Sequence, residues 1–484
     1  MGRWFRSLVG ALAWLVIVVG PASAADRPNI VLVMCDDLGW GDVGFNGNQV
    51  IRTPHLDAMA AAGMKFNRFY AASAVCSPTR GSVVTGRHPY RYGIPGANSG
   101  HMKAQELTLA ELLKKLGYAT GHFGKWHLGT LTRTVVEANR GGPRGVKHFS
   151  PPQSNGFDVC FSTESKVPTY DPMLKPATGA SGKGWDYIQD KSDAAQYNTH
   201  YWNERGEMVR DNLEGDNSRV IMDRAIPFIE ASAGEGKPFL AVVWFHTPHL
   251  PVVAGPKHAG LYAEHDSYAR NYFGCITAMD EQVGRLRKSL RDLEVARNTI
   301  VTFCSDNGPE GQAKNAPGSA GPFRGRKRDL YEGGVRVPGL LEWPARVKPG
   351  STSDFPAVTS DYLPTILQIV GVKMPDRRPL DGVSLLSVLE GRMTERPQPI
   401  GFAYGGKVAL TDNRYKLIRT GGGRKRKKSD TAAGKGYALF DLVIDPGETT
   451  DLAAKHPQRA GEMARTLESW LDSCRRSGAG EDYR

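Results

Sequence analysis

A cysteine followed one helical turn later by an arginine is the first group of residues in this chain that could do chemistry. Residues 76–80 read Cys-Ser-Pro-Thr-Arg. Ser77 is a good N-cap residue and Pro78 fits the first helical position, so the pattern predicts that Cys76 lies at the start of a helix. The dipole and free N–H groups of that end favour an anion, which Arg80 can also reach. A buried structural cysteine beside a surface arginine is the alternative interpretation.

Acidic residues follow two continuous apolar runs. Asp36 and Asp37 follow the first run, and Asp306 and Asn307 follow the second. If both runs are strands of an open α/β sheet, their carboxyl ends meet at one edge of that sheet. Carboxylate and amide oxygens suit a hard divalent cation, Ca²⁺ or Mg²⁺. The sequence therefore predicts a metal site at this edge.

Basic residues follow two further apolar runs. Lys125 and His127 follow the run that ends at residue 123, and they face the same side if the segment is extended. His246 and His249 follow the run 239–245. We expect these side chains at the same sheet edge as the acids.

The elements that must position these residues indicate an α/β fold. Four runs that are apolar on both sides predict buried strands, and the helices between them predict a large, mostly parallel or mixed sheet sandwiched by helices. One helix is expected to begin at Thr108, with a capping box to Glu111, and to end at Gly117. Another is expected from about Ser267 to Leu293. The four strands are expected at residues 30–34, 118–123, 239–245 and 299–303.

The pattern of apolar and polar residues changes in the last part of the chain. Four short alternating segments from residue 400 to 442, followed by a helix from about Gln458 to Ser473, predict a small antiparallel sheet with a packed helix. We therefore expect a signal peptide over 1–24, a catalytic domain over 25–395 and a C-terminal subdomain over 396–484.

The first residues predict export. Arg3 and Arg6 precede a short apolar run and the small residues Ala22-Ser23-Ala24, which is typical of a cleaved signal peptide and too short for a stable membrane span. A periplasmic or secreted protein results, and nucleic acid is not an expected partner there. A retained anchor is the alternative.

Charge and cysteine content add two expectations. The formal net charge is +12, part of which comes from the basic run at residues 424–428. This run is either a solvated loop or a docking patch for a polyanionic chain. The six cysteines have no paired spacing, so we expect no disulfide scaffold, and Cys35 and Cys304 are expected to be buried neighbours.

Several motifs in a fixed order resemble the formylglycine-dependent sulfatases, which belong to the alkaline phosphatase superfamily. Beyond Cys-x-Pro-x-Arg and Thr-Gly-Arg at 85–87, the matches are Asp36-Asp37, Gly-Lys-Trp-His-Leu-Gly at 124–129, His-Thr-Pro-His at 246–249, Ser-Asp-Asn-Gly at 305–308, and Lys327 before Tyr-Glu-Gly-Gly at 331–334. The segments Leu-Phe-Asp-Leu at 439–442 and Asp-Pro-Gly-Glu at 445–448 are also typical of that family. The resemblance covers nearly the whole chain after the signal peptide.

The resemblance implies a mechanism and a cofactor set. A formylglycine-generating enzyme would oxidise Cys76 to formylglycine, whose hydrated aldehyde attacks sulfur with the help of Asp306 as base and later collapses to release sulfate. One Ca²⁺ would be bound by Asp36, Asp37, Asp306, Asn307 and the modified Cys76.

The same resemblance implies the remaining roles. Arg80 would hold the nucleophile, Lys125 and Lys327 would neutralise sulfate, and His127 would be the base for sulfate release. We expect His246 to protonate the leaving alcohol, because it follows the apolar run directly. His249 is either the alternative for that role or a substrate-binding residue.

Two departures from the family pattern concern specificity. Arg324, Arg326 and Arg328 flank Lys327 and indicate a more cationic rim, with Arg326 a candidate for substrate binding. The insertion over 130–202 has no motif with a readable function, and long loops at this sheet edge usually shape specificity.

Three functions compete at this point. The favoured one is an exported, Ca²⁺-dependent sulfatase that acts on sulfated polysaccharides or oligosaccharides. The alternatives are a phosphodiesterase or phosphonate monoester hydrolase of the same superfamily, and a non-catalytic protein that binds sulfated glycans.

Overall fold

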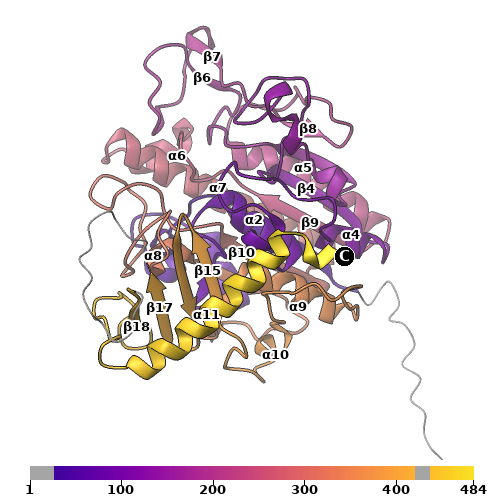
Figure 1. The fold of residues 1–484 in the computed structure, drawn as a ribbon. Helices are drawn as coiled ribbons and strands as arrows, with labels where there is room; N and C mark the ends of the chain where they lie inside the picture. The colour runs from indigo at the N-terminus through magenta and orange to yellow at the C-terminus, as the bar shows by residue number, and fades with distance from the viewer. Residues whose placement is uncertain (1–26, 420–435, 484) are drawn as a thin grey trace, which may run out of the picture.

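The computed structural model describes residues 27–419 and 436–483, which have an α/β architecture (Figure 1). The expected signal peptide over 1–24 and the basic run at 424–428 lie outside the described residues. In the described part of the chain, no helix is long and apolar enough to cross a membrane.

A mixed sheet, nine-stranded in the described residues, forms the centre of the fold in the order β13-β2-β12-β10-β1-β9-β4-β5-β8. Its consecutive strands β10, β1, β9, β4 and β5 are parallel. The four expected strands correspond to β1, β4, β9 and β10. The strands are β1 (Asn29–Cys35), β2 (Met64–Phe66), β4 (Ala119–Lys125), β5 (Val159–Thr163), β8 (Trp202–Asn203), β9 (Phe239–Trp244), β10 (Thr299–Ser305), β12 (Gly339–Glu342) and β13 (Ser351–Ser353).

Helices cover both faces of this sheet, as the sequence predicts. Along β1, Ile30 and Leu32 face the core that contains α2, α4, α9 and α10, whereas Val31 and Val33 face the core that contains α1, α5 and α7. Because both faces are buried, β1 is apolar on both sides. The helices are α1 (Pro54–Ala62), α2 (Cys76–Thr85), α3 (Pro89–Tyr92), α4 (Leu109–Lys114), α5 (Asn217–Gly234), α6 (Pro256–Ala259), α7 (Ser267–Asp292), α8 (Glu332–Val335), α9 (Tyr362–Ile369) and α10 (Leu386–Leu389).

The capping box predicted for α4 is confirmed. The Thr108 side chain accepts a hydrogen bond from the Glu111 backbone N–H, and the Glu111 carboxylate accepts one from the Thr108 N–H. The helix ends at Lys114, earlier than expected, and Gly117 adopts a left-handed conformation in the turn that follows.

Smaller sheets complete the fold. A three-stranded sheet in the order β11-β3-β14 and a two-stranded hairpin β6-β7 lie outside the large sheet. The hairpin belongs to the insertion over 130–202 and projects at the top of Figure 1. The bounds are β3 (Phe69–Tyr70), β6 (Leu174–Pro176), β7 (Ala194–Gln196), β11 (Arg336–Val337) and β14 (Ala357–Val358).

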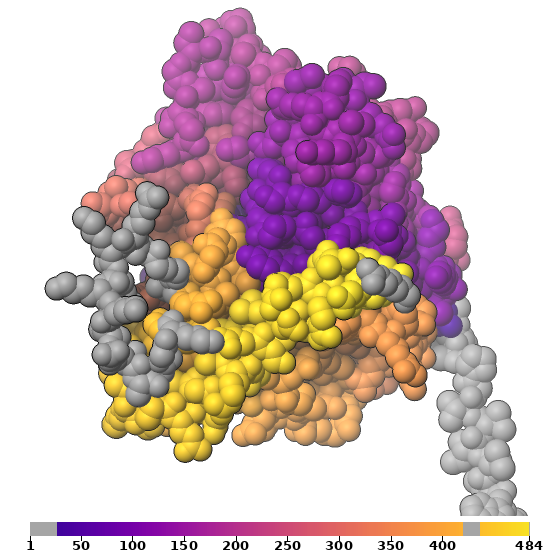
Figure 2. Space-filling view, viewed as in Figure 1, coloured from indigo at the N-terminus to yellow at the C-terminus, as the bar shows by residue number. Residues whose placement is uncertain are grey.

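The C-terminal segment forms an antiparallel sheet of four described strands, β15-β16-β17-β18, packed against helix α11 (Pro457–Gly478). In Figure 2 this helix lies across the seam between the C-terminal sheet and the N-terminal part of the chain. The predicted C-terminal antiparallel sheet is confirmed. The predicted division between two parts of the chain at residue 396 stays a prediction. The strands are β15 (Ile400–Tyr404), β16 (Lys407–Thr411), β17 (Tyr415–Arg419) and β18 (Ala438–Asp441).

All six cysteines lie in the described residues, and each is a buried free thiol. Cys304 pairs with Met34 in the β1–β10 register, one position from Cys35. The two side chains therefore project from opposite faces of the sheet, Cys304 into the core that contains α9 and Cys35 into the core that contains α7, and they are not bonded.

Candidate active site

The two acidic pairs meet at the carboxyl edge of the large sheet. Strands β1 and β10 are parallel neighbours, and their register pairs Cys35 with Ser305, so the residues that follow come together. The Asp37 backbone N–H donates to Asp306 Oδ1 at 3.1 Å, and Asn307 Nδ2 donates to Asp37 Oδ1 at 2.7 Å. This is the proximity that the sequence predicts.

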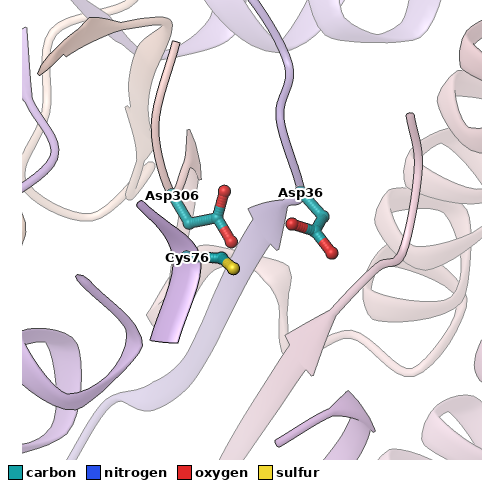
Figure 3. A group of neighbouring side chains, drawn as sticks. All are labelled: Asp36, Cys76 and Asp306. Atoms are coloured by element: carbon teal, nitrogen blue, oxygen red, sulfur yellow. The ribbon is translucent and has the colours of Figure 1, made fainter. Parts of the chain in front are cut away.

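Cys76 begins helix α2 beside these acids. Its Sγ and carboxylate oxygens of Asp36 and Asp306 lie within 4.8 Å of one another, and the three side chains point toward a common centre (Figure 3). Burial raises the pKa of the Cys76 thiol. The structure thus brings the candidate nucleophile to the candidate metal ligands.

The expected cap of α2 is wrong by two residues. The N-cap is Val75, and Ser77 lies inside the first turn, where its hydroxyl donates a hydrogen bond to the His127 carbonyl. Pro78 consequently occupies the third helical position and not the first. Tertiary contact with His127 overrides the local capping preference of serine, while Cys76 remains at the helix start.

The oxygen donors fit a divalent cation. Asp36 Oδ1 and Asn307 Oδ1 are buried and have no hydrogen-bond partner among the described residues. Buried acceptors of this kind are costly unless a ligand satisfies them. A set of carboxylate and amide oxygens is the chemistry that Ca²⁺ or Mg²⁺ prefers.

Three buried cations surround these acids. Arg80 Nη2 lies 2.6 Å from Asp306 Oδ2 and 3.6 Å from Asp36 Oδ1, and Lys125 Nζ lies 2.6 Å from Asp36 Oδ2. Lys327 Nζ lies 2.7 Å from Asp37 Oδ2. Matching the acids with cations keeps the buried charge nearly balanced.

The surroundings of Asp36 and Asp306 shift the pKa values of the two carboxyl groups in opposite directions. Burial opposes ionisation of Asp36, but Lys125, followed by His249 and Arg80, holds the pKa of Asp36 well below its usual range. Burial, with the nearby Asp36, raises the pKa of Asp306 to about 7. A cation bound between them would favour both charged forms.

His127 lies beside Cys76, the candidate nucleophile, although its backbone conformation is not the expected one. Strand β4 ends at Lys125, and His127 has φ 58°, so the extended geometry assumed from the sequence does not hold at that residue. Its Nδ1 nevertheless lies 3.4 Å from Cys76 Sγ, and its Nε2 lies 2.8 Å from Asn98 Oδ1. Burial lowers the pKa of His127 well below its ordinary value.

The two histidines after β9 differ in accessibility. Both ring nitrogens of the buried His246 have protein partners. Its Nε2 lies 2.8 Å from Thr163 Oγ1, and its Nδ1 accepts a hydrogen bond of 3.0 Å from Asn217 Nδ2. His249 Nε2 lies 3.7 Å from Asp37 Oδ2, and 14% of its side chain is exposed. Burial lowers the pKa of His249 to about 4. Of the two, His249 is the histidine that a substrate can meet.

The arginines around Lys327 are occupied by protein partners. Arg326 Nη2 donates to the carbonyl oxygens of Glu310 and Gly318 at 2.9 and 2.8 Å. Arg328 forms an ion pair with Glu310, and Arg324 stacks over the ring of Tyr331. Arg326 therefore holds the loop that precedes Lys327.

Sequence reasoning missed three residues near the site. Glu310 lies 3.1 Å from Lys327 Nζ, and Asn98 contacts His127. Lys166 comes three residues after β5, and burial, together with Lys125 and Lys327, lowers its pKa. The strand-end rule would have indicated Lys166 had β5 been recognised, whereas the sequence gives no signal for Asn98.

Comparisons with known proteins agree with this geometry. A family model described as Sulfatase matches residues 28–372, and one described as N-sulphoglucosamine sulphohydrolase, C-terminal, matches residues 321–477. The chain is 34% identical over 432 residues to N-acetylgalactosamine-6-sulfatase of Sus scrofa, covering 86% of this chain and 75% of that one. It is 31% identical over 472 residues to arylsulfatase G of Rattus norvegicus, covering 90% and 84%.

A solved structure extends the likeness to three dimensions. The crystal structure of Ps i-CgsB in complex with k-i-k-neocarrahexaose superposes with a TM-score of 0.75 at 25% identity, covering 92% of each chain.

Proposed function

The chain belongs to the sulfatase family and is a sulfuric ester hydrolase, and from this premise we propose an exported enzyme that desulfates polysaccharides or oligosaccharides using formylglycine and Ca²⁺. The observation that carries the proposal is the meeting of Cys76 with Asp36 and Asp306, beside buried oxygens that lack hydrogen-bond partners. Hydrolysis of a sulfate ester requires a nucleophile, ligands for a hard cation, and positive charges that stabilise the sulfate.

Two groups would be added to the chain. Formylglycine, made from Cys76 by a formylglycine-generating enzyme, supplies the nucleophile for sulfur and the means to release sulfate afterwards. The Ca²⁺ would be held by Asp36, Asp37, Asp306 and Asn307, and it would stabilise negative charge on the reacting oxygens. The closeness of the acids and the two oxygens without hydrogen-bond partners, Asp36 Oδ1 and Asn307 Oδ1, support this choice of ligands.

The chain's own cations position the sulfate. Lys125 pairs with Asp36, and Lys327 pairs with Asp37, so both ammonium groups lie beside the acidic residues. There they would neutralise sulfate oxygens. Arg80 is fixed by three partners, Asp306, Asp36 and the Lys125 carbonyl, and would hold the nucleophile.

Of the two alternatives left open by the sequence for the proton donor, we propose His249 and not His246. His249 is proposed as the proton donor to the leaving alcohol, because it is the accessible one of the pair, and the negative charge of a bound sulfate would favour its protonated form. His246 is proposed as a structural residue, since both of its ring nitrogens contact buried side chains. His127 keeps its proposed role as the base for sulfate release, facing residue 76 through Nδ1.

The substrate class is supported by the relatives. One acts, by its name, as an N-acetylgalactosamine-6-sulfatase, and the Ps i-CgsB structure contains a ligand named as a hexaose. Lys166 adds a positive charge near the sulfate lysines, and no carboxylate of the described residues forms an ion pair with it. Spare positive charge at the site suits an anionic glycan.

The test is sulfate release by enzyme that carries formylglycine. The protein is produced together with a formylglycine-generating enzyme, and mass spectrometry of the peptide across Cys76 verifies the modification. Sulfate is then measured from sulfated oligosaccharides, an aryl sulfate and a matched phosphate diester.

The expected outcome is release from at least one sulfated oligosaccharide at a higher kcat/KM than from the aryl sulfate. Exclusive cleavage of the aryl sulfate would overturn the glycan proposal, and faster diester cleavage at every pH would replace the sulfatase reaction with a phosphodiesterase one. A thiol that stays unmodified in the native host would remove the proposed nucleophile.

Export is tested separately by the N-terminal sequence of the mature protein. We expect it to begin at Ala25. An intact Met1 in a cytoplasmic fraction would contradict export.

A further inference from the structure

We propose that Asn98, supported by Asn139 from the insertion, is a positioning residue that fixes the tautomer and orientation of His127. The inference rests on the proposed function, in which His127 is the base beside residue 76. It adds a role for the loop over 95–101 and for part of the insertion over 130–202, neither of which carries a readable motif.

The contacts form a chain of three hydrogen bonds. Asn98 Oδ1 lies 2.8 Å from His127 Nε2, and the same oxygen accepts a hydrogen bond of 3.1 Å from Asn139 Nδ2. Asn139 Nδ2 also donates to Ser165 Oγ at 2.8 Å. Both lone pairs of the Asn98 oxygen are thus used, one by the neighbouring amide and one by the histidine.

The chemistry follows from the limits of a neutral imidazole. Such a ring has one N–H donor and one lone pair, so an acceptor oxygen at Nε2 requires the proton to be on Nε2. The lone pair is then on Nδ1, which is 3.4 Å from Cys76 Sγ. In this tautomer Nδ1 can accept a proton from a hydroxyl group on residue 76, and the imidazolium that results keeps its Nε2–H bond to Asn98.

The arrangement is built from segments that are distant in the chain. Arg140 Nη1 donates to the Gly100 carbonyl at 2.5 Å, and Arg140 Nε lies 3.2 Å from the buried carboxylate of Glu164. The insertion therefore clamps the loop that carries Asn98. The Ser77 hydroxyl holds His127 from the other side through its backbone carbonyl.

The amide is not needed for core packing. Both Asn98 and Asn139 are exposed. Asn98 has φ 61°, a left-handed conformation that asparagine, aspartate and glycine tolerate better than other residues. Replacement by glycine or aspartate should therefore leave the backbone in place, so a functional change would come from the lost or altered amide.

The first experiment reads the tautomer directly in protein that keeps the Cys76 thiol. Long-range ¹H–¹⁵N spectra of ¹⁵N-histidine-labelled protein identify the protonated ring nitrogen, and a His127→Gln sample assigns the signal. We expect Nε2–H in the wild type and in Asn98→Asp, and a mixture of tautomers in Asn98→Gly. Nδ1–H in the wild type, or an unchanged signal in Asn98→Gly, would overturn the inference.

The second experiment measures steady-state kinetics of formylglycine-containing variants. Asn98→Gly is expected to lose about 10- to 100-fold in kcat with little change in KM, by analogy with the loss found when the hydrogen-bond partner of a metal-bound histidine is removed. Asn98→Asp should recover most of that loss, because a carboxylate oxygen accepts the same hydrogen bond. Asn139→Ala, a second variant in case Asn98→Gly does not fold, should show a smaller loss of kcat.

Asn212→Gly is the matched control, because Asn212 is also an exposed left-handed asparagine and its side chain contacts Asp223 and Arg219 instead. It should retain the wild-type kcat.

The outcomes separate the possible failures. Wild-type enzyme that releases no sulfate from any ester would defeat the proposed function while leaving the tautomer result intact. Active wild-type enzyme with an unchanged kcat in Asn98→Gly would defeat the inference alone. A rise in KM with unchanged kcat would assign Asn98 to substrate contact and also contradict the positioning role.

Discussion

Two groups of buried charges in this molecule serve different ends. The site cluster lies at the carboxyl edge of the large sheet, and the interface cluster lies between that part of the chain and the C-terminal sheet. The site cluster consists of Asp36, Asp37, Arg80, Lys125, Asp306 and Lys327, and the interface cluster consists of Glu332, Arg336, Lys416 and Glu448.

The clusters differ in how their oxygen atoms are paired. In the interface cluster, Glu332 Oε2 accepts from the Tyr70 hydroxyl at 2.9 Å and from Arg336, while its Oε1 accepts from Lys416 Nζ at 3.1 Å. In the site cluster, Asp36 Oδ1 receives no hydrogen bond from the described residues although its carboxyl group is held in the charged form.

One oxygen of the interface cluster also lacks a hydrogen bond, but its surroundings differ from those of Asp36 Oδ1. Glu448 Oε1 has no hydrogen-bond partner among the described residues, but it lies 3.1 Å from Lys416 Nζ, and burial raises the pKa of Glu448 to about 7. Lys416 or a proton can therefore satisfy that carboxyl group. Asp36 stays charged, and among the described residues its Oδ1 has only Arg80 Nη2, 3.6 Å away. Close pairing of every oxygen stabilises a fold, whereas a buried, charged carboxylate with one oxygen that receives no hydrogen bond is a candidate ligand of a cation.

The largest expected effect comes from removing the proposed nucleophile, Cys76, which lies beside the site cluster. Cys76→Ala should lower sulfate release by at least about 10⁴-fold, because no group at position 76 remains to attack sulfur. Thermal unfolding should change little. Activity within tenfold of the wild type, measured by ion chromatography of sulfate, would contradict the proposed role.

The corresponding change in the interface cluster should affect stability and not chemistry. Lys416→Met leaves Glu332 and Glu448 without their shared cation, and removing one partner of a buried pair costs about 3–5 kcal/mol. Urea unfolding measures the loss. The control is Lys407→Met, whose half-exposed pair with Asp329 should contribute roughly 0–1 kcal/mol. Equal losses in the two variants would contradict the comparison.

Removal of metal should act only on the site cluster. Chelation should abolish activity and lower the unfolding temperature, and Ca²⁺ at 100 times its Kd should restore about 2.7 kcal/mol of stability. Asp36→Asn should lose this Ca²⁺ response, while Lys416→Met should keep it. A wild-type protein whose unfolding temperature ignores both chelator and Ca²⁺ would refute the metal site.

The interface cluster should give stability a distinctive pH dependence. The pKa of Glu448 is about 7 in the folded protein against an ordinary value of 4.5, so the folded state binds more protons between these pH values. Stability from this group is therefore present at low pH and falls as pH rises from about 4.5 to 7. Glu448→Gln should remove that part of the slope in urea unfolding series, and an unchanged slope would count against the assignment.

The smallest expected effect concerns Lys166, which lies near the site and forms no ion pair within residues 27–419 and 436–483. Lys166→Ala should raise KM for a sulfated oligosaccharide about fivefold, close to 1 kcal/mol, since one partly screened charge is lost. Stability should stay within about 0.5 kcal/mol of the wild type, in contrast to Lys416→Met. An unchanged KM for every sulfated substrate would remove Lys166 from substrate binding.

The sequence by itself determined four adjacent inner strands of the sheet and the place of the acids. Runs that are apolar on both sides can be satisfied only between two layers of helices, which is why the expected strands match β1, β4, β9 and β10. Parallel strands end at a common edge, so Asp36 and Asp306 were predictable neighbours. Local chemistry also predicted that Cys76 lies at the mouth of a helix, although the helix begins two residues before the position that the Ser77 cap implied.

Only the tertiary structure decided which polar groups are free. His246 and His249 are three residues apart and look equivalent in the sequence, yet contacts with Thr163 and Asn217 seal the first and leave the second accessible. Ser77 was expected to cap its helix and instead holds His127, which Asn98 approaches from a distant loop. Hydrogen-bond partners of this kind come from segments far apart in the chain, and local propensity carries no information about them.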